Sequence, residues 1–285
     1  MKIFCCLIFN IIATISIAQE YYDIKGTVLD EHKAPVAFVN VFINETKVGT
    51  YTDEQGNFSL KTNISKGILL ISHIGYKSDS ISINRIKDAD SLNITLIEHP
   101  NVIQETTVVG NKRTSKRTLG FFDRRTNYTL CVGNGTVLAL FVRNDIKEEG
   151  TIKKLMVKFK KVKNNPLVRF RLYANNRTGQ GPGTEIPTKI APIQLKTNKK
   201  NLVVDISDFN IPFPLDGIFV GVEIVKGGDY EKNTGYSYPF FMVTEKENDY
   251  NTWMSFMGNN WGHSALTKLS NGMPLNVKFG IEVLY

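Results

Sequence analysis

The chain contains 285 residues, of which 42% are hydrophobic and 22% are charged, and its formal net charge at pH 7 is +8. This length is enough for two modest domains with separate hydrophobic cores. Acidic residues outnumber basic ones between positions 19 and 98, and basic residues are in excess afterwards. Because these basic residues alternate with apolar strand positions, we interpret them as a solvated surface rather than a site for an anionic partner.

The N-terminal residues predict a secretory signal peptide, residues 1–18. Lys2 is followed by an apolar run over residues 3–17, which ends at the small residues Ser16 and Ala18. A charged start, a short apolar core and an A-x-A-like end are typical of a segment removed on export. The run is shorter than the ~18 uninterrupted apolar residues of a spanning helix. We therefore expect no membrane-spanning segment in the mature chain and no nucleic-acid partner.

Only one cysteine is expected in the mature chain. Cys5 and Cys6 lie inside the signal peptide and no cysteine stands at its cleavage point, so a lipid anchor is not expected. Cys131 then has no partner for an internal disulfide. Because Leu130 and Val132 flank it, we interpret Cys131 as a strand residue rather than a nucleophile.

Residues 19–98 predict a small β-sandwich. Short segments with apolar residues at alternate positions are separated by Gly, Pro, Asn and Asp. The predicted strands are residues 23–30, 36–44, 46–52, 56–61, 67–73, 76–83 and 91–97. No stretch shows a sustained helical period.

The order of these segments resembles a known family. The segments are Ile24-Lys25-Gly26-Thr27-Val28, Ala34-Pro35-Val36, Val39-Asn40-Val41, residues 52–60 and residues 69–76. Together they resemble the carboxypeptidase regulatory-like domain, a transthyretin-like β-sandwich common in exported proteins of Bacteroidetes-type bacteria. The resemblance implies a seven-stranded sandwich and a non-catalytic role, since the domain is named after a non-catalytic appendage of a zinc peptidase.

Residues 99–120 predict a basic linker. Pro100 opens it, and residues 112–118 are basic and polar without a clear buried face, so we expect it to be exposed and mobile. Residues 105–110 resemble the segment that follows the same domain in TonB-dependent outer-membrane receptors, where it pairs with an energy-transducing protein. A receptor barrel of about twenty strands at ~10 residues each needs several hundred residues. Only 165 residues follow position 120, so we interpret the segment as an extended linker or a relic.

Residues 121–285 predict a second β-sandwich, of jelly-roll type. The predicted strands are residues 127–132, 136–143, 151–161, 167–174, 189–196, 201–206, 218–225, 236–243, 251–257 and 275–284. In strand 167–174, apolar residues alternate with Arg169, Arg171 and Tyr173. Such alternation is typical of an antiparallel sheet with one wet face. Residues 169–173, 181–183, 203–207, 210–214 and 217–223 resemble a domain of unassigned activity that often follows the regulatory-like domain.

No pattern indicates catalysis, a metal ion or a cofactor. The histidines His32, His73, His99 and His263 stand far apart and outside any H-E-x-x-H or H-x-x-E motif, and G-x-S-x-G, P-loop and dinucleotide motifs are absent from the sequence. The oxygen-rich residues 53–57 lack the spaced acidic ligands of an EF-hand, so we interpret them as a tight turn with a positive φ at Gly56. We predict no catalytic residue, no metal site and no cofactor. A triad assembled from distant residues stays open.

The C-terminal aromatic residues are the best candidates for ligand binding. Tyr236, Tyr238, Trp253 and Trp261 lie among amide and acidic residues. Flat rings beside amides and carboxylates can stack on sugar faces and hydrogen-bond sugar hydroxyls. In the alternative interpretation, Trp253 fills the core and the tyrosines are ordinary edge residues. Rings that face out together on one sheet would favour binding.

The sequence therefore predicts an exported, all-β, non-catalytic binding or scaffold protein of a Gram-negative envelope. We expect it in the periplasm, on the outer-membrane surface or outside the cell, with a glycan or an envelope protein as its partner; no oligomeric state is indicated. One alternative is a structural accessory of an outer-membrane assembly related to TonB-dependent receptors, with a large apolar or edge-strand surface. The other is a hydrolase with an unrecognised site, in which a histidine lies beside a carboxylate.

Overall fold

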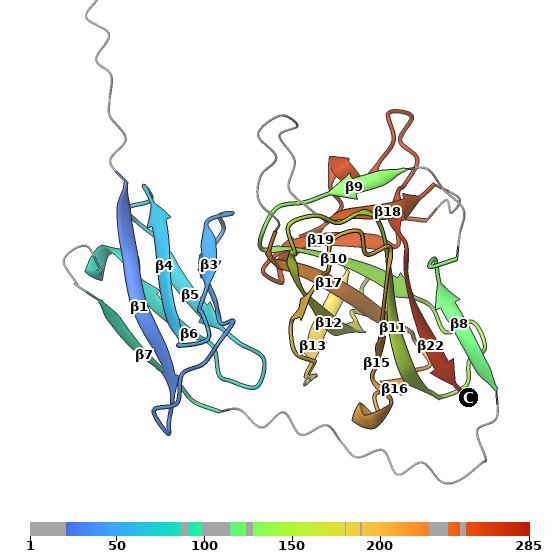
Figure 1. Cartoon of the computed structure of the whole chain (residues 1–285), viewed down its shortest axis with the longest axis horizontal. Coiled ribbons are helices and arrows are strands. Elements are labelled where there is room, and N and C mark those ends of the chain that lie inside the picture. The colour runs from blue at the N-terminus through green and yellow to red at the C-terminus, as the bar shows by residue number, and fades with distance from the viewer. Residues whose placement is uncertain are drawn as a thin grey trace, which may run out of the picture.

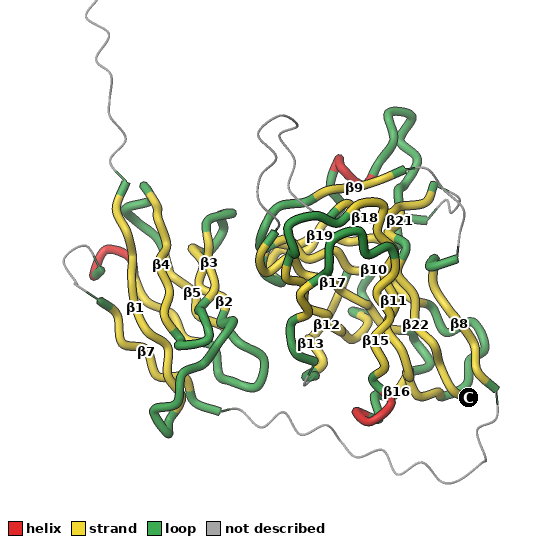
Figure 2. Tube along the Cα trace, in the orientation of Figure 1, coloured by secondary structure: helices red, strands yellow, loops and turns green. Residues whose placement is uncertain are grey.

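The computed structural model describes residues 21–86, 91–98, 115–123, 128–179, 181–188, 190–227, 239–245 and 249–285. The predicted signal peptide, most of the predicted linker, and Tyr236 and Tyr238 lie outside these residues. Strands form two units that lie side by side (Figure 1). Loops and turns connect the strands, and the helical segments of the described residues are three short turns (Figure 2). These turns are Ile83–Arg85, Ser207–Phe209 and Ala265–Thr267. Over the described ranges, no helix has the length and apolar character needed to cross a membrane.

The N-terminal unit, described between residues 21 and 98, is a sandwich of two sheets. Its strands are β1 (Tyr22–Asp30), β2 (Asn40–Ile43), β3 (Gly49–Tyr51), β4 (Asn57–Thr62), β5 (Ile68–Ser72), β6 (Asp79–Ser82) and β7 (Leu92–Leu96). One sheet has the order β4-β1-β7 and the other the order β3-β2-β5-β6. Alternate side chains face the space between the sheets, where Ile24, Val28, Val41 and Ile71 are part of the core.

The predicted turn over residues 53–57 is confirmed. Gly56 has a φ of 77°, and a Cβ added there would come within 2.5 Å of the carbonyl oxygen of Val28. The Oδ1 atom of Asp53 accepts hydrogen bonds from the backbone N–H groups of Gln55 and Asn57. The carboxylate of Asp53, which by residue type could bind calcium, therefore accepts the hydrogen bonds that close the turn.

The C-terminal unit, described between residues 115 and 285, is a larger sandwich with one main core between its sheets. Its strands are β8 (Lys116–Gly120), β9 (Thr129–Cys131), β10 (Thr136–Val142), β11 (Gly150–Lys161), β12 (Leu167–Asn175), β13 (Pro182–Ile186), β14 (Ile193–Gln194), β15 (Asn201–Asp205), β16 (Pro212–Phe213), β17 (Ile218–Lys226), β18 (Phe240–Thr244), β19 (Thr252–Phe256), β20 (Asn259–Gly262), β21 (Asn276–Val277) and β22 (Phe279–Leu284). The seven-stranded sheet has the order β13-β12-β17-β10-β19-β20, with β14 beside β12. The eight-stranded sheet has the order β21-β18-β11-β22-β8, with β15 and β16 beside β11 and β9 beside β18. The all-β fold predicted from the sequence is confirmed in both units.

Strand β8 corrects the predicted end of the linker. Residues 116–120, which the sequence assigned to the linker, pair antiparallel with β22. The strand is mostly exposed, and only Leu119 packs against the core. An edge strand with one apolar contact has no alternating pattern, so periodicity cannot reveal it. Strands β13 and β20 were missed as well, because their Gly, Pro and Asn residues are typical of turns.

The prediction of a wet face was wrong for the seven-stranded sheet. Arg169 and Arg171 are each 8% exposed and Tyr173 is 2% exposed. The predicted alternation itself is present, since Val168 and Phe170 face the core. The outward face is nevertheless buried, because the N-terminal unit and a group of aromatic side chains cover it.

We expect Phe241→Ala to lower the free energy of unfolding by about 3–5 kcal/mol. Phe241 is fully buried between Phe159 and Phe279, with ring centroids 5.3 and 5.8 Å away, so truncation leaves a cavity between the sheets. Urea unfolding of the full chain measures the loss. The control is Val203→Ala, at a residue that is 49% exposed, where the change should stay below about 0.5 kcal/mol. Equal losses in the two variants would contradict the core assignment.

Candidate functional site at the junction of the two units

Four charged side chains form a buried charge cluster on the outward face of the seven-stranded sheet. They are Arg169 and Arg171 on β12, Glu223 on β17 and Glu185 on β13. Nε and Nη2 of Arg169 lie 2.8 and 2.7 Å from Oε2 of Glu223. Nη1 of Arg171 donates to Oε1 of Glu223 at 3.3 Å, and its Nε and Nη2 both donate to the carboxylate of Glu185. Glu223 thus accepts hydrogen bonds from two guanidinium groups.

The N-terminal unit completes the hydrogen bonding of this cluster. Nη2 of Arg169 donates to Oδ1 of Asn40 at 2.9 Å, and Nη1 donates to the carbonyl oxygen of Phe38 at 3.1 Å. The hydroxyl of Tyr51 donates to Oε1 of Glu223 at 2.9 Å. Buried charges are stable only when they are paired and hydrogen-bonded. The N-terminal unit therefore provides part of the environment that the charge cluster requires.

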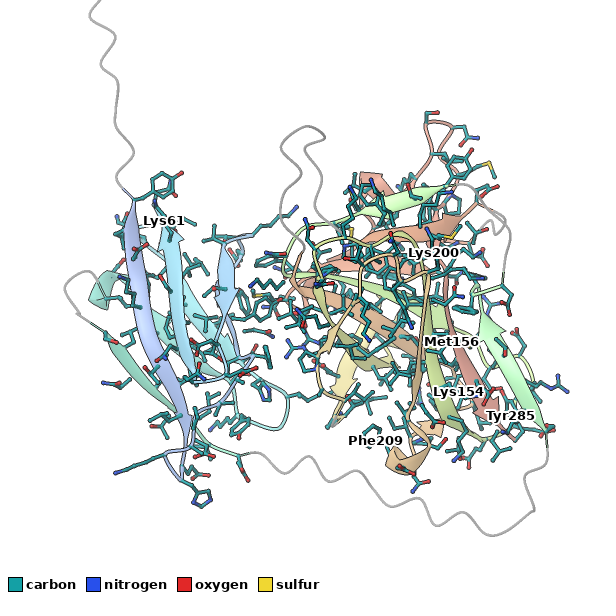
Figure 3. All side chains as sticks on the ribbon, in the orientation of Figure 1. Lys61, Lys154, Met156, Lys200, Phe209 and Tyr285 are labelled. Atoms are coloured by element: carbon teal, nitrogen blue, oxygen red, sulfur yellow. The ribbon has the colours of Figure 1, made fainter. Side chains whose placement is uncertain are left out.

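Apolar contacts surround the charges along the seam, which we define as the contact between β2–β3 and the outward face of the seven-stranded sheet. Side chains of both units reach into the space between the two ribbons (Figure 3). Phe42 on β2 is only 3% exposed, and its ring meets Phe256 edge-on at 6.4 Å between centroids. Met257, at the tip of the β19–β20 hairpin, lies against Gly49, where an added Cβ would come within 3.0 Å of its thioether. Positive φ angles of 52° at Met257 and 85° at Gly258 form this tight hairpin turn.

The protonation states at the seam fit a structural network. Burial by itself would raise the pKa of Glu223, but the charges of Arg169 and Arg171 outweigh burial and lower it. The pKa of Tyr51 is raised well above its ordinary value, first by burial and then by the charge of Glu223. At neutral pH the carboxylate is therefore ionised and accepts, while the phenol is protonated and donates.

His73 belongs to the same electrostatic environment. It is half-buried, in the loop that follows β5, and its ring lies 5.4 Å from that of Tyr76. Its pKa is lowered from 6.5 to about 4, first by burial and then by the charge of Arg169. The imidazole is therefore neutral at pH 7, and a proton on it would add a cation near two buried guanidinium groups.

Trp253 and Trp261, two of the four predicted binding residues, lie on the same outward face. They pack on a group of side chains that includes Tyr173 and Phe219, apart from the main core. The rings of Trp261 and Tyr173 meet edge-on at 5.0 Å, and an added Cβ at Gly181 would come within 2.6 Å of the Trp253 ring. Both tryptophans are half-buried, so the structure brings them together without leaving them fully open. The other two predicted residues, Tyr236 and Tyr238, lie outside the described residues.

Three rings lie in succession, tilted by 42° and 48° against one another, and form the aromatic ladder, which runs from this group to the surface. The ring centroids of Trp253 and His263 lie 4.0 Å apart, and those of His263 and Tyr250 lie 5.1 Å apart. His263 is exposed and Tyr250 is 37% exposed. The Tyr250 hydroxyl donates to the carbonyl oxygen of Gly272 at 2.6 Å, which holds the outer ring in place. The sequence did not predict His263 here, because it joins the ladder only through the pairing of β19 with β20.

Two clefts open along the seam. The first seam cleft, of about 450 Å³, lies between the β2–β3 turn and the β19–β20 hairpin, and its lining includes Lys47, Phe256, Asn259, Asn260 and His263. The second seam cleft, of about 910 Å³, is lined by residues that include Thr50, Asp53, Asn134, Asn165 and Lys226. Within the ranges that the structure covers, no three His, Cys, Asp or Glu side chains are grouped so that they could hold a metal ion.

Comparison with known proteins places the N-terminal unit in a family. Residues 24–109 match the family model of the CarboxypepD_reg-like domain. This stretch is a CarboxypepD_reg-like domain. The resemblance predicted from the sequence is therefore confirmed.

The curated relatives of the chain are much longer proteins. It is 30% identical over 115 residues to the TonB-dependent receptor SusC of Bacteroides thetaiotaomicron, a match that covers 40% of this chain and 11% of the receptor. It is 32% identical over 88 residues to the TonB-dependent receptor P39 of Formosa agariphila, covering 31% of this chain and 8% of that receptor. The chain thus spans about a tenth of the length of these relatives.

Among solved structures, the major pilin subunit BcpA of Bacillus cereus was matched. The match has 10% sequence identity and a TM-score of 0.19, and it covers 90% of this chain and 69% of the pilin chain. A TM-score this low supports no argument about fold or function.

We expect Glu223→Gln to lower the free energy of unfolding by about 3–5 kcal/mol, because it removes the negative charge between two buried guanidinium groups. Chemical unfolding of the full chain measures the loss. The control is Asp216→Asn, which breaks the pair with Arg177 at 2.9 Å, where the Arg177 side chain is 86% exposed; this should cost less than about 1 kcal/mol. Similar small losses would show that the CarboxypepD_reg-like domain does not cover the charge cluster.

Stability should also fall below pH 6.5 through His73. Because the pKa of His73 is about 4 in the folded protein and 6.5 when free, the unfolded chain takes up a proton over this interval that the folded chain does not. The contribution of neutral His73 to the free energy of unfolding is complete above pH 6.5. It is lost as the pH falls toward 4, by about 3 kcal/mol at most. Urea unfolding at pH 7 and pH 4.5 tests this against His73→Gln, which should lose less stability over the same interval. An identical pH dependence in the two proteins would contradict the assignment.

Proposed function

We propose that the protein is a non-catalytic binding or scaffold component of a bacterial envelope, in which the two units act as one body and bind a ligand along the aromatic ladder. The observation that carries this proposal is the succession of Trp253, His263 and Tyr250, which is anchored in half-buried residues and ends at the exposed ring of Tyr250, where the ammonium of Lys268 lies 5.0 Å from the ring centroid. Ring faces that are held in place offer apolar contact area at a low cost in conformational entropy.

The envelope setting is supported by the comparisons and by the N-terminal sequence. Both curated relatives are named as TonB-dependent receptors. The charged start and short apolar run of residues 1–18 are typical of export. A protein that shares the CarboxypepD_reg-like domain with these receptors suits a role at the same location.

The charge cluster supports the part of the proposal in which the two units act as one body. Arg169 and Glu223, which belong to the C-terminal unit, reach three groups of the N-terminal unit: Asn40, the Phe38 carbonyl and Tyr51. Separating the units would leave these hydrogen bonds to water and expose Phe42. Directional polar contacts also fix how the two units are oriented, more than apolar contact alone would.

The immediate contacts of the histidines support a binding protein over a hydrolase. The Nδ1 atom of His263 lies 3.1 Å from the carbonyl oxygen of Thr252, which can only accept, so Nδ1 carries the proton. Among the described residues no carboxylate is hydrogen-bonded to this ring, whereas a base in a catalytic triad is oriented by such a partner. His73 lies near guanidinium groups, which disfavour its protonated form.

A protein partner is the second candidate for the ligand. Leu266 is 54% exposed and Met273 is 37% exposed, and both lie in the segment between β20 and β21, which also holds the Tyr250 hydroxyl. Exposed apolar side chains beside an aromatic stack are typical of a surface that contacts another protein. This arrangement favours the structural-accessory alternative.

We expect Tyr250→Ala and His263→Ala to weaken ligand binding about tenfold each, which corresponds to about 1.4 kcal/mol. Their rings contribute contact area that only the complex buries, so the melting temperature should change little. Binding is measured with an oligosaccharide array and by capture of envelope proteins, and unfolding is followed on the same samples.

The control is Phe209→Ala, which removes a ring that is 38% exposed at the far end of the C-terminal unit (Figure 3). It should leave both binding and melting unchanged. Undiminished binding by both ladder variants, or no binding of any oligosaccharide or envelope protein by the natural chain, would contradict the proposed function.

A further inference from the structure

The first seam cleft contains polar side chains whose hydrogen-bonding groups are not used by the protein. Asn259 and Asn260 both line it, and their side-chain amides make no hydrogen bond with any residue that the structure describes. Each amide offers two N–H donors and one carbonyl acceptor. The two residues are adjacent at the start of β20, so two amide-bearing residues follow each other along the lining of the cleft.

Local contacts fix the backbone that carries these amides. The hydroxyl of Ser255 donates to the carbonyl oxygen of Asn259 at 2.5 Å, across the β19–β20 hairpin. Asn260 has a φ of 52°, in the left-handed region that asparagine tolerates better than most residues. Groups that are fixed before binding lose less entropy when a ligand arrives.

The same cleft also presents ring faces. Phe256 is held between Phe42, which meets it edge-on, and Gly135, where an added Cβ would come within 2.4 Å of the ring. His263 lines the cleft and stacks on Trp253, so the aromatic ladder and the cleft share a residue. Because Nδ1 faces the carbonyl oxygen of Thr252, Nε2 is the ring nitrogen that remains for a ligand.

The charges of the lining favour a neutral ligand. Glu45 and Lys47, both exposed on the β2–β3 turn, have opposite charges that cancel. Amide pairs, hydroxyl groups and ring faces around a volume of about 450 Å³ are within the size range of small-ligand sites. The ligand chemistry that fits this lining is a chain of hydroxyl groups with apolar ring faces and no net charge.

The second seam cleft is larger but its polar groups are more fully used. Oδ1 of Asn134 accepts a hydrogen bond from the N–H of Gly227 at 2.6 Å, and Oδ1 of Asn165 accepts one from the N–H of Thr197 at 3.2 Å. Amides that close loops in this way have fewer groups left for a ligand. The two clefts therefore differ in binding capacity even though both lie on the seam.

We propose that the first seam cleft binds a neutral oligosaccharide, with Asn259, Asn260 and His263 of the C-terminal unit on one side and Lys47 of the CarboxypepD_reg-like domain on the other. This inference rests on the proposed function and names its ligand class and its site. The amides and Nε2 of His263 contact sugar hydroxyls, and the ring of Phe256 contacts the apolar sugar face. Neither unit alone provides the whole site, so binding depends on the seam.

The test uses the full chain. An array of neutral and acidic oligosaccharides selects the best neutral oligosaccharide, which is then titrated calorimetrically into the natural protein and into variants. We expect the double variant Asn259→Ala/Asn260→Ala to raise Kd at least tenfold, and Lys47→Met, on the other unit, to raise it about threefold. The matched control is Asn93→Ala, which removes an exposed amide on β7, and should leave Kd unchanged. Thermal unfolding of every variant checks that the fold is kept.

Each result has a defined meaning. Loss of affinity in the double variant and in Lys47→Met, with Asn93→Ala unchanged, supports the inference. If the neutral oligosaccharide binds and Tyr250→Ala weakens it while both cleft variants do not, the cleft is overturned and the proposed function stands. Binding of acidic oligosaccharides only, or of none, overturns the inference. In that last case the proposed function is judged separately, by whether envelope proteins bind the natural chain and not the ladder variants.

Discussion

The carboxylate of Glu223 is the group on which the arrangement of this protein depends. It is fully buried in the middle of a strand and accepts hydrogen bonds from two guanidinium groups and a phenol. Two of these donors come from β12 and the third comes from the other unit. A buried ion pair adds little net stability compared with an apolar replacement, but removing one partner is costly. Its main effect here is to require one specific partner on the sheet face, because Tyr51, Asn40 and the Phe38 carbonyl complete the hydrogen bonds of the cluster.

From this constraint follows the position of the candidate site. The outward face of the seven-stranded sheet is divided between two coverings, the N-terminal unit over the charges and the aromatic side chains beside them. The β19–β20 hairpin belongs to both parts. At the turn of this hairpin, Met257 lies against Gly49. Trp253 lies on its first strand, and its second strand begins with Asn259 and Asn260 and is followed by His263. One hairpin therefore connects the packing of the two units with the groups available to a ligand.

Alternation in the sequence was enough to predict most strands and the all-β fold, because it reports which residues share a face. It does not report what lies on that face. Arg169 and Arg171 have the same two-residue spacing as charged side chains on a solvent-exposed strand face. Their pairing becomes visible only when an acidic residue is found on the neighbouring strand. Glu223, an isolated acid inside the apolar run of 218–225, was the available signal of a buried partner. The meeting of Trp253 with His263 could not be predicted, since it depends on a hairpin whose Asn and Gly residues are typical of loops.

Strand β8 has a consequence for the synthesis of the chain. It is the first described strand of the C-terminal unit, and among the described residues it is hydrogen-bonded to one strand, β22, the last in the sequence. Residues 116–120 leave the ribosome long before residues 279–284, so this edge of the sheet cannot close until the later residues have been made. A nascent chain must keep β8 unpaired until the end, and folding of the unit is expected to be a late, cooperative event dominated by contacts distant in sequence. Until then the unit stays open, and its exposed strands are accessible to any factor that binds unfolded chains.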